Sequence, residues 1–462
     1  MVTAPDPLAE LEAQLRRRGV KRLAVTWVNH AGAVLVKVVP VGALASAVKL
    51  GVGFSPVSDA FRSDGAIDPQ HRLARPDGDL RLRADPASLA PLEAASGWAW
   101  AAGTRHHRDG GLYDGDQRGF CSRQQHELAG AGLVLQAGFE LEWMVVGGEE
   151  PGQDGPQPAL AGGPYGADRL VEGLDYAAAL TDACDAAGLP WQQLHPEYGR
   201  GQFELSLAPA SPLQAADRLV LAKLLIQRVS RRFGWRCSFS PKPFAALVGN
   251  GGHVHLSVRQ GGAALLQDGE GPGGLQPGGA AVVAGLLQHL PALLPLACNS
   301  AVSYRRLAPG SWSAPFQAWG IENREAAVRL VPAAADGAEA HLELKVADLT
   351  ANPYLLLGAL QAVVAESLTR PAGELAAAAT ALPEPVAGDP SVLEEEEAPR
   401  LPATLAEASQ AFAASTLLRC ALGEALHGSL LDAQQAEIRR AHNLSDDALL
   451  AASRWWPIVG GL

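Results

Sequence analysis

The sequence predicts an α+β protein with a small N-terminal domain and a larger C-terminal domain. Helical patterns alternate along the chain with short strands in which polar and apolar side chains alternate. The length of 462 residues is enough for more than one domain. Apolar residues make up 48% and charged residues 19%, a globular composition that excludes a disordered or fibrous protein.

The N-terminal elements are predicted from a hairpin pattern and a cluster of turn residues. After an initial amphipathic helix, residues 22–39 form two β-rich runs around Asn29–Gly32, which is typical of a β-hairpin. Short strands follow, and Gly and Asp then cluster at residues 108–116. We therefore expect a first domain over residues 1–112 and a second over residues 113–462.

Helical patterns dominate the second domain. The apolar stretch from Ala280 to Cys298 contains a histidine and two prolines, so we expect a buried or amphipathic helix pair and not a membrane span. The other predicted helices of this domain cover residues 117–130, 176–189, 216–233, 352–368 and 405–423.

The charge balance restricts the kind of partner. Lys and Arg number 37 and Asp and Glu number 49, which gives a net charge of −12. A chain of this charge without a basic block is unsuited to nucleic acid or to an anionic membrane, and an anion such as ATP would need bridging cations. Five scattered cysteines without a CxxC pair indicate a reducing compartment. With no apolar signal segment near the N-terminus, we expect a cytoplasmic protein.

Four predicted strands carry ionisable side chains on one face, because residues two apart in a strand share a face. These faces hold Glu140 and Glu142; Gln202 and Glu204; His253, His255 and Ser257; and His341, Glu343 and Lys345. Two carboxylates about 5 Å apart repel by roughly 3 kcal/mol at an effective dielectric near 20. The combination of carboxylates and imidazoles therefore favours Mg²⁺ or Mn²⁺ sites. For any single strand the alternative is an ordinary sheet with one solvent-facing side.

Taken in order, the motifs resemble those of the glutamine synthetase family over nearly the whole chain. Residues 139–143 resemble its "PEPEFF" strand, and residues 195–204 resemble "HHE…GQxE". Further matches are 241–244 and 249–255 with "PKP…NGSGxHxH", 299–329 with "NSYKRLxPG…NR…R", and 342–355 with "IExRxPDxxANPYL". No P-loop, Rossmann, HExxH or GxSxG motif competes with this resemblance.

The resemblance implies an N-terminal β-grasp-like domain and a catalytic domain with a curved antiparallel sheet flanked by helices. It implies assembly in rings, usually two stacked hexamers, with each active site between adjacent subunits. It also implies ATP-dependent chemistry, in which the γ-carboxylate of glutamate is phosphorylated and an amine attacks the acyl phosphate. Two or three Mg²⁺ or Mn²⁺ ions per site would hold the phosphates and offset the developing charge.

The resemblance also assigns roles by motif position. The candidate metal ligands are Glu142, Glu197 and Glu204 near the glutamate, and Glu140, His253 and Glu343 near the nucleotide phosphates. The candidate catalytic residues are Arg324 and Arg306, of which Arg306 would also meet the substrate carboxylate. The remaining candidates are Arg329, His255 and Ser257 for the nucleotide, and Gly249, Asn250, Ser313 and Lys345 for the substrates.

Two departures from the family concern the amine. Where ammonia-using members carry an Asp-containing "FDGSS" loop, this chain has residues 54–58, with Asp59 and Asp64 out of register. The flap "PGxEAP" is replaced by residues 309–315, which hold no carboxylate. A small cation in a dry pocket needs an adjacent anion. Trp312 and Trp319 would instead offer apolar or π surface to an organic amine, unless they serve only core packing.

Other departures concern the carboxylate site and the subfamily. Lys345 stands where the family has Arg, and His341 stands at another usual arginine. The short "GNGxHxH" form at residues 249–255 is similar to the type III branch, which includes γ-glutamyl amide synthetases. The regulatory tyrosine loop has no counterpart between residues 380 and 405, so adenylylation control is not expected.

The leading hypothesis is an ATP-dependent ligase that joins an amine to the γ-carboxyl of glutamate or a close analogue, with an organic amine favoured over ammonia. One alternative is a true glutamine synthetase that uses Asp59 or Asp64. A second is a catalytically silent family member that acts as a structural or ligand-sensing ring. The sequence gives neither the amine nor the exact oligomer.

Overall fold

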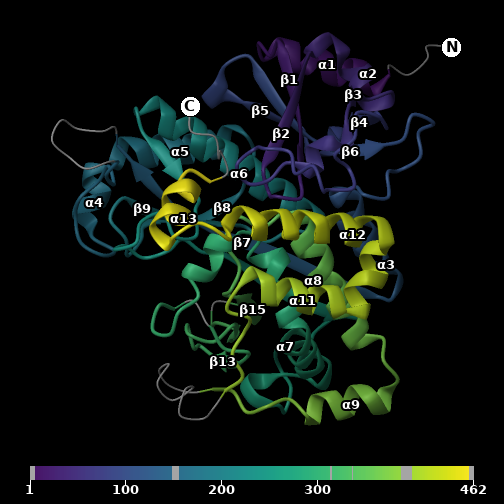
Figure 1. Cartoon of the computed structure of the whole chain (residues 1–462), viewed down its shortest axis with the longest axis vertical. Coiled ribbons are helices and arrows are strands. Elements are labelled where there is room, and N and C mark those ends of the chain that lie inside the picture. The colour runs from purple at the N-terminus through teal and green to yellow at the C-terminus, as the bar shows by residue number, and fades with distance from the viewer. Residues whose placement is uncertain (1–5, 148–155, 313–314, 336, 387–397, 457–462) are drawn as a thin grey trace.

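The structure is a computed structural model that describes residues 6–147, 156–312, 315–335, 337–386 and 398–456. The described residues fold around two sheets, a smaller one near the N-terminus and a larger one in the rest of the chain (Figure 1). The prediction of an α+β fold with a curved, largely antiparallel sheet is confirmed.

The first sheet has the strand order β2-β1-β6-β4-β3, with β5 paired to β6. The predicted hairpin is β1 and β2, and its turn is stabilised by Asn29, whose Oδ1 accepts the Ala33 N–H at 2.9 Å. The pair β1–β6 is parallel, and helices α1 (Pro7–Arg17) and α2 (Leu44–Lys49) contribute Leu15 and Leu44 to the core of this sheet. The strands are β1 (Arg22–Val28), β2 (Val34–Pro40), β3 (Val52–Phe54), β4 (Leu80–Ala84), β5 (Ala90–Leu92) and β6 (Trp98–His106).

The second sheet has the order β13-β14-β15-β11-β7-β9-β8, and β10 and β12 pair with β7 and β11. All of these pairs are antiparallel except β13–β14. The four predicted polar strands lie in β7, β9, β11 and β15, which are consecutive in this order. The strands are β7 (Leu133–Val146), β8 (Trp191–Pro196), β9 (Gln202–Leu207), β10 (Arg236–Ser238), β11 (Gly252–Gln260), β12 (Ala263–Ala264), β13 (Trp319–Ile321), β14 (Val328–Val331) and β15 (His341–Leu344).

Helices pack against the second sheet and against one another. Helix α6 packs on β7, and α8 packs on α3, α6 and α7, so the apolar face of the strands is enclosed. The predicted helix over 405–423 is divided at Ser415, which caps the next helix by accepting the Leu418 N–H. The helices are α3 (Gln117–Gly130), α4 (Ala167–Glu172), α5 (Leu174–Ala186), α6 (Pro212–Arg232), α7 (Pro277–Ala297), α8 (Pro353–Leu368), α9 (Ala372–Thr380), α11 (Leu405–Ala414), α12 (Thr416–Ala441) and α13 (Asp446–Ser453).

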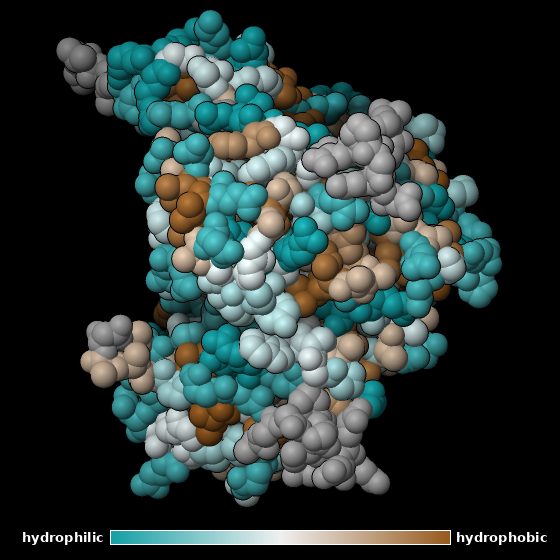
Figure 2. All heavy atoms as spheres, turned by 90° about the vertical axis from the view of Figure 1, so that its left-hand side faces the viewer, coloured by the Kyte–Doolittle hydropathy of each residue, from teal (hydrophilic) through white to brown (hydrophobic). Residues whose placement is uncertain are grey.

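The apolar stretch predicted as a helix pair is one helix, α7. Pro291 has no N–H, and the carbonyl of Leu287 that it leaves unpaired accepts the side chain of Gln317 at 2.6 Å. By length and composition α7 could cross a membrane, but it is mostly buried against α8, α9 and α11 and is a core helix. On the face in Figure 2, hydrophobic residues form small separate patches among hydrophilic ones.

A buried histidine connects the N-terminal hairpin to later helices. His30, which follows β1, is 1% exposed, and its Nε2 lies 2.7 Å from Ser429 Oγ in α12. Gln117 in α3 donates to His30 Nδ1 at 2.7 Å, so the imidazole is neutral in this network. Burial, opposed by the charge of Asp59, lowers the pKa of His30 to about 4.

This histidine predicts acid sensitivity. An imidazole with a lowered pKa contributes stability above its ordinary pKa of 6.5, and that stability is lost as the pH falls through about 4. The loss amounts to about 3 kcal/mol at most. We expect the free energy of unfolding of the wild-type protein to fall more steeply between pH 6.5 and 4 than that of His30→Gln. Urea unfolding at both pH values measures this, and equal acid dependence in both proteins would contradict it.

Candidate active site

The register of the second sheet brings the predicted ionisable side chains together. Directly opposite residues of an antiparallel pair have Cβ atoms about 4.5–5.5 Å apart, so their side chains meet on one face. The opposite pairs are His255 with Glu343, His253 with Glu140, Glu142 with Glu204, and His195 with Glu204.

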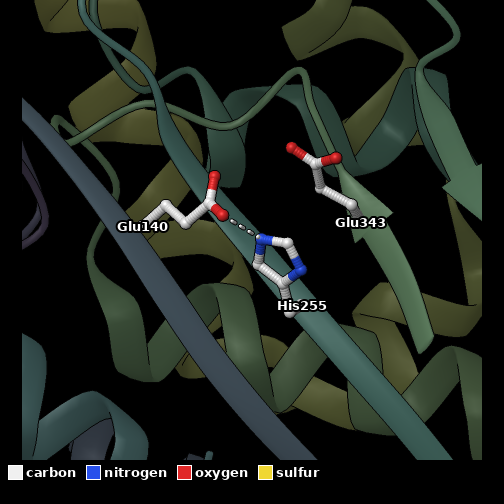
Figure 3. Close-up of side chains that lie close together, drawn as sticks. All are labelled: Glu140, His255 and Glu343. Carbon is white, nitrogen blue, oxygen red and sulfur yellow. Dashed lines mark ion pairs between the residues drawn. The ribbon is translucent and has the colours of Figure 1, made fainter. Parts of the chain in front are cut away.

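The first cluster contains Glu140, His255 and Glu343, which converge from β7, β11 and β15 (Figure 3). One ligand atom from each lies within 4.8 Å of the others. His253 belongs to the same cluster, because its Nδ1 lies 3.2 Å from Glu140 and 3.3 Å from Glu343. The predicted group of Glu140, His253 and Glu343 is thus assembled, and His255 joins it.

The second cluster contains His195, Glu197 and Glu204 at the end of β8 and in β9. His195 Nε2 lies 3.9 Å from Glu197 Oε1 and 3.9 Å from Glu204 Oε1. Glu142 lies between the clusters, opposite Glu204 on the next strand and with its Oε1 3.8 Å from His253 Nε2. The two clusters therefore form one continuous acidic surface across the sheet.

The two clusters differ in how well their charges are balanced. Burial and the nearby carboxylates of Glu140, Glu142 and Glu197 raise the pKa of Glu204 to about 10. Burial and Glu142 also raise the pKa of Glu197. The second cluster thus lacks positive charge, and a divalent cation would supply it.

In the first cluster, positive groups outweigh the cost of burial. Burial alone would raise the pKa of Glu140, but contacts with His253 and His255 lower it overall. Burial is likewise outweighed at Glu343, where Lys345 and the two histidines lower the pKa. Both glutamates are therefore ionised and able to act as ligands.

Two buried imidazole nitrogens of the site have no hydrogen-bond partner among the described residues, and one of them, His255 Nε2, lies beside a carboxylate. His255 Nε2 is buried and lies 3.2 Å from Glu140 Oε1 but lacks hydrogen-bond geometry, and the buried His195 Nδ1 has no partner among the described residues. Buried polar atoms are normally paired, so the unpaired His255 Nε2 beside Glu140 is suited to coordination. In His195 it is Nε2, and not the unpaired Nδ1, that faces Glu197 and Glu204. Oxygen-rich donor sets with some imidazole fit Mg²⁺ or Mn²⁺.

Arg306 connects the flap region to the first cluster. It is 5% exposed, and its Nη2 lies 3.2 Å from His253 Nε2. The same guanidinium donates to the backbone carbonyls of Val346 at 3.0 Å and Lys345 at 2.9 Å. Arg306 is therefore fixed beside the first cluster.

The other predicted basic residues are placed differently from one another. Arg329 is bonded to Glu343 at 3.0 Å and to Glu322 at 2.6 Å, so its guanidinium is held by carboxylates. Lys345 is 4% exposed and donates to Glu343 at 2.9 Å. Arg324 is exposed, and its charge acts on Tyr165 beside the second cluster.

The predicted substrate loop is held by Gln202. Its Nε2 donates to Glu142 at 3.1 Å, to the Gly249 carbonyl at 2.8 Å and to Asn250 Oδ1 at 2.9 Å. Asn250 is fully buried and donates in turn to the Ser240 carbonyl at 2.8 Å. Gln202 thus fixes Gly249 and Asn250 next to a candidate metal ligand. The side chain of Asn250 is therefore engaged in hydrogen bonds with Gln202 and Ser240.

Two predicted residues remain, of which the structure describes only Ser257. Ser257 is half-buried in β11, two residues beyond His255. Ser313 lies outside the described residues.

Two residues of the site had no role in the sequence-based prediction. His195 and Gln202 both lie in the segments that carry the family resemblance, so the motifs could have marked them as candidate site residues. Their functions depend on contacts with neighbouring strands: His195 faces Glu204, and Gln202 reaches Asn250 across the sheet.

The residues considered for the amine differ in burial and in their partners. Asp59 is fully buried and pairs with Arg105 at 2.6 Å, and Asp64 pairs with Arg62 at 2.6 Å. Trp319 is fully buried and donates to the Pro383 carbonyl at 2.7 Å, so the idea that it offers surface to a substrate is wrong. Trp312 is 55% exposed.

A sheet face with two groups of carboxylates, imidazoles and fixed arginines is chemically suited to divalent ions and an anionic substrate. Comparisons with known proteins are consistent with a site of this kind. A model of the glutamine synthetase catalytic domain matches residues 114–449. The γ-glutamylpolyamine synthetase GlnA3 of Streptomyces coelicolor is 41% identical over 456 residues, 96% of this chain and 95% of that protein. The glutamine synthetase of Methanocaldococcus jannaschii is 31% identical over 287 residues, 61% of each chain.

Solved structures with a similar fold include glutamine synthetase homologues. One described as a novel glutamine synthase homolog has a TM-score of 0.80 and 28% identity, covering 93% of this chain and 97% of that one. The complex of GmaS with ADP has a TM-score of 0.80 and 27% identity, covering 94% and 97%. This chain therefore belongs to the glutamine synthetase family. It is an ATP-dependent ligase that forms γ-glutamyl amides, and the family uses divalent metals.

Proposed function

We propose that this ligase joins the γ-carboxyl of glutamate to a polyamine in preference to ammonia. The observation that carries the proposal is Asp59, whose carboxylate is sealed in a fully buried ion pair with Arg105. The flap holds no carboxylate over residues 309–315. The two carboxylates that would hold ammonium, by resemblance to ammonia-using members, are therefore not available at the amine position. The likeness to a γ-glutamylpolyamine synthetase supports the polyamine.

In this proposal the chain's own residues perform three tasks. One Mg²⁺ or Mn²⁺ ion is held by Glu140, His253 and Glu343 at the nucleotide phosphates and another by Glu142, Glu197 and Glu204 near the glutamate, with His255 and His195 as added candidate ligands. Bound ions neutralise phosphate charge. Arg306 orients the substrate carboxylate, and Arg324 and Arg329 contact the phosphoryl group or nucleotide. Gly249, Asn250 and Lys345 line the substrate site, and Ser257 lies towards the nucleotide.

The γ-carboxylate of glutamate must be activated before an amine can attack it, because a free carboxylate has no good leaving group. Transfer of phosphate from ATP to the γ-carboxylate supplies one. The amine nitrogen then forms a bond to the acyl carbon, the carbon–oxygen bond to phosphate breaks, and the amine loses a proton. The remaining amino groups of a polyamine stay cationic beside the acidic clusters.

A panel of amines tests the substrate. We expect purified protein with ATP, glutamate and Mg²⁺ to give at least about tenfold higher kcat/KM with putrescine or spermidine than with ammonium, which corresponds to about 1.4 kcal/mol of transition-state discrimination. Mass spectrometry of the products should show γ-glutamyl amides. Efficient turnover with ammonium alone would indicate a true glutamine synthetase, and absence of turnover with every amine would favour a silent protein.

We also propose the organisation around this site. Residues 1–112 would form an N-terminal domain and residues 113–462 the catalytic domain. The chains would assemble as two stacked hexamers in the cytoplasm. The family resemblance supports this assembly, and light scattering of the purified protein measures the native mass that tests it.

A further inference from the structure

A buried carboxylate lies beneath the turn formed by residues 310–312. Glu325 is 5% exposed, and its Oε1 accepts the Gly310 N–H at 2.9 Å while its Oε2 accepts the Trp312 N–H at 2.8 Å. Each oxygen thus takes a backbone amide, which is the pattern of an ionised acceptor with charge-assisted hydrogen bonds. The pairing joins the turn to the segment between β13 and β14.

The turn has a backbone conformation that needs support. Gly310 has a φ of +73° and Trp312 a φ of +54°, and the left-handed region is unfavourable for a residue with a bulky side chain. Backbone amides in such turns form a concave site for an anion. Here that anion is the side chain of Glu325. The result is that the Trp312 indole is held outward and is 55% exposed.

The turn is attached to residues that contact the first cluster. Ser311 Oγ donates to the Arg306 carbonyl at 3.2 Å, and the Arg306 guanidinium reaches His253. On the other side, the charge of Lys345 acts on Glu325, and Lys345 donates to Glu343. The turn that carries Trp312 is therefore hydrogen-bonded to Arg306, whose guanidinium lies beside the candidate metal ligand His253.

We propose that Glu325 is a positioning residue for the amine half of the reaction, because it holds the Gly310–Trp312 turn and so fixes the Trp312 indole beside the site. This inference rests on the proposed function. The indole face suits the methylene chain and ammonium groups of an organic amine. Glu325 itself, with both oxygens occupied by backbone amides, does not contact the amine.

Hydrogen exchange and steady-state kinetics test this role together. In Glu325→Ala we expect the amides of Gly310 and Trp312 to exchange at least about tenfold faster, because they lose their acceptor. The KM for the amine should rise about tenfold, while the KM for ATP and for glutamate stays within about twofold. Glu325→Gln, which keeps one acceptor oxygen, should give intermediate values. Trp312→Ala should raise the amine KM and leave the Gly310 amide protected, and Glu374→Gln on exposed α9 serves as the control.

The possible outcomes separate this inference from the proposed function. Unchanged exchange at residues 310 and 312 in Glu325→Ala would overturn it, as would equal increases in KM for all three substrates. If the wild-type protein uses ammonium in place of organic amines, the proposed function fails, but exchange in the variants and their KM for ammonium still report whether Glu325 positions the turn.

Discussion

Replacing Glu343 with glutamine is expected to lower kcat/KM for amide formation by about a hundredfold to a thousandfold. Glu343 is 1% exposed and lies within 3.3 Å of His253, Lys345 and Arg329, so it is the most connected carboxylate of the first cluster. Glutamine has the same shape but carries no charge for a cation. Loss of one preorganised electrostatic group in an active site typically costs about 10²–10³ in rate.

The matched control for this variant is Glu339→Gln. Glu339 precedes β15 and pairs with Arg259 in a partly exposed ion pair outside the two clusters, so its removal should leave the rate nearly unchanged. Rates of ADP formation with glutamate, an amine and Mg²⁺ measure both variants, and circular dichroism checks that both are folded. A Glu343→Gln protein within about threefold of wild type would contradict a metal-binding role for this glutamate.

Replacing Glu204 with glutamine is expected to stabilise the metal-free protein while nearly abolishing activity. Burial and three neighbouring carboxylates raise the pKa of Glu204 from its ordinary value of 4.5 to about 10. A carboxyl with a raised pKa contributes stability below pH 4.5 that is lost as the pH rises towards 10. Glutamine carries no charge at any of these pH values. The metal-free variant should therefore melt higher than metal-free wild type at neutral pH, by roughly 2 °C or more.

Addition of a divalent cation should reverse the order of melting temperatures, so that the wild-type protein melts higher than Glu204→Gln. Mg²⁺ or Mn²⁺ neutralises the carboxylates of the second cluster only where the ligands are intact, so the Tm of the wild-type protein should rise more than that of Glu204→Gln. Differential scanning calorimetry with EDTA and then with excess Mn²⁺ provides the comparison. The account fails if the metal-free variant is less stable than wild type and both respond equally to Mn²⁺.

The strand pattern predicted much of the site because its period is unambiguous. Alternation placed Glu140 and Glu142 on the face opposite Phe139 and Leu141, which are buried in the core. The sequence could not show that the four strands are neighbours, since β7 and β15 are separated by most of the catalytic region. The order β15-β11-β7-β9 follows from tertiary pairing, and the family resemblance was the only indication of it.

Contacts between distant segments account for what the sequence did not predict. Asp59 was considered for ammonium, and nothing in its local sequence indicated that Arg105 would bury and neutralise it. Glu325 was not singled out, because its role depends on a turn that lies beside it only in the fold. The helix α7 continues through Pro291 because Gln317, from another segment, bonds the carbonyl that the proline leaves free.

We infer that the two clusters bind divalent ions on one face of the second sheet. Anomalous diffraction from crystals soaked in Mn²⁺ tests this most directly, because it locates the metal without reference to activity. We expect one peak among Glu140, His255, His253 and Glu343 and another among His195, Glu197, Glu204 and Glu142. Manganese bound elsewhere, with neither cluster occupied, would contradict it.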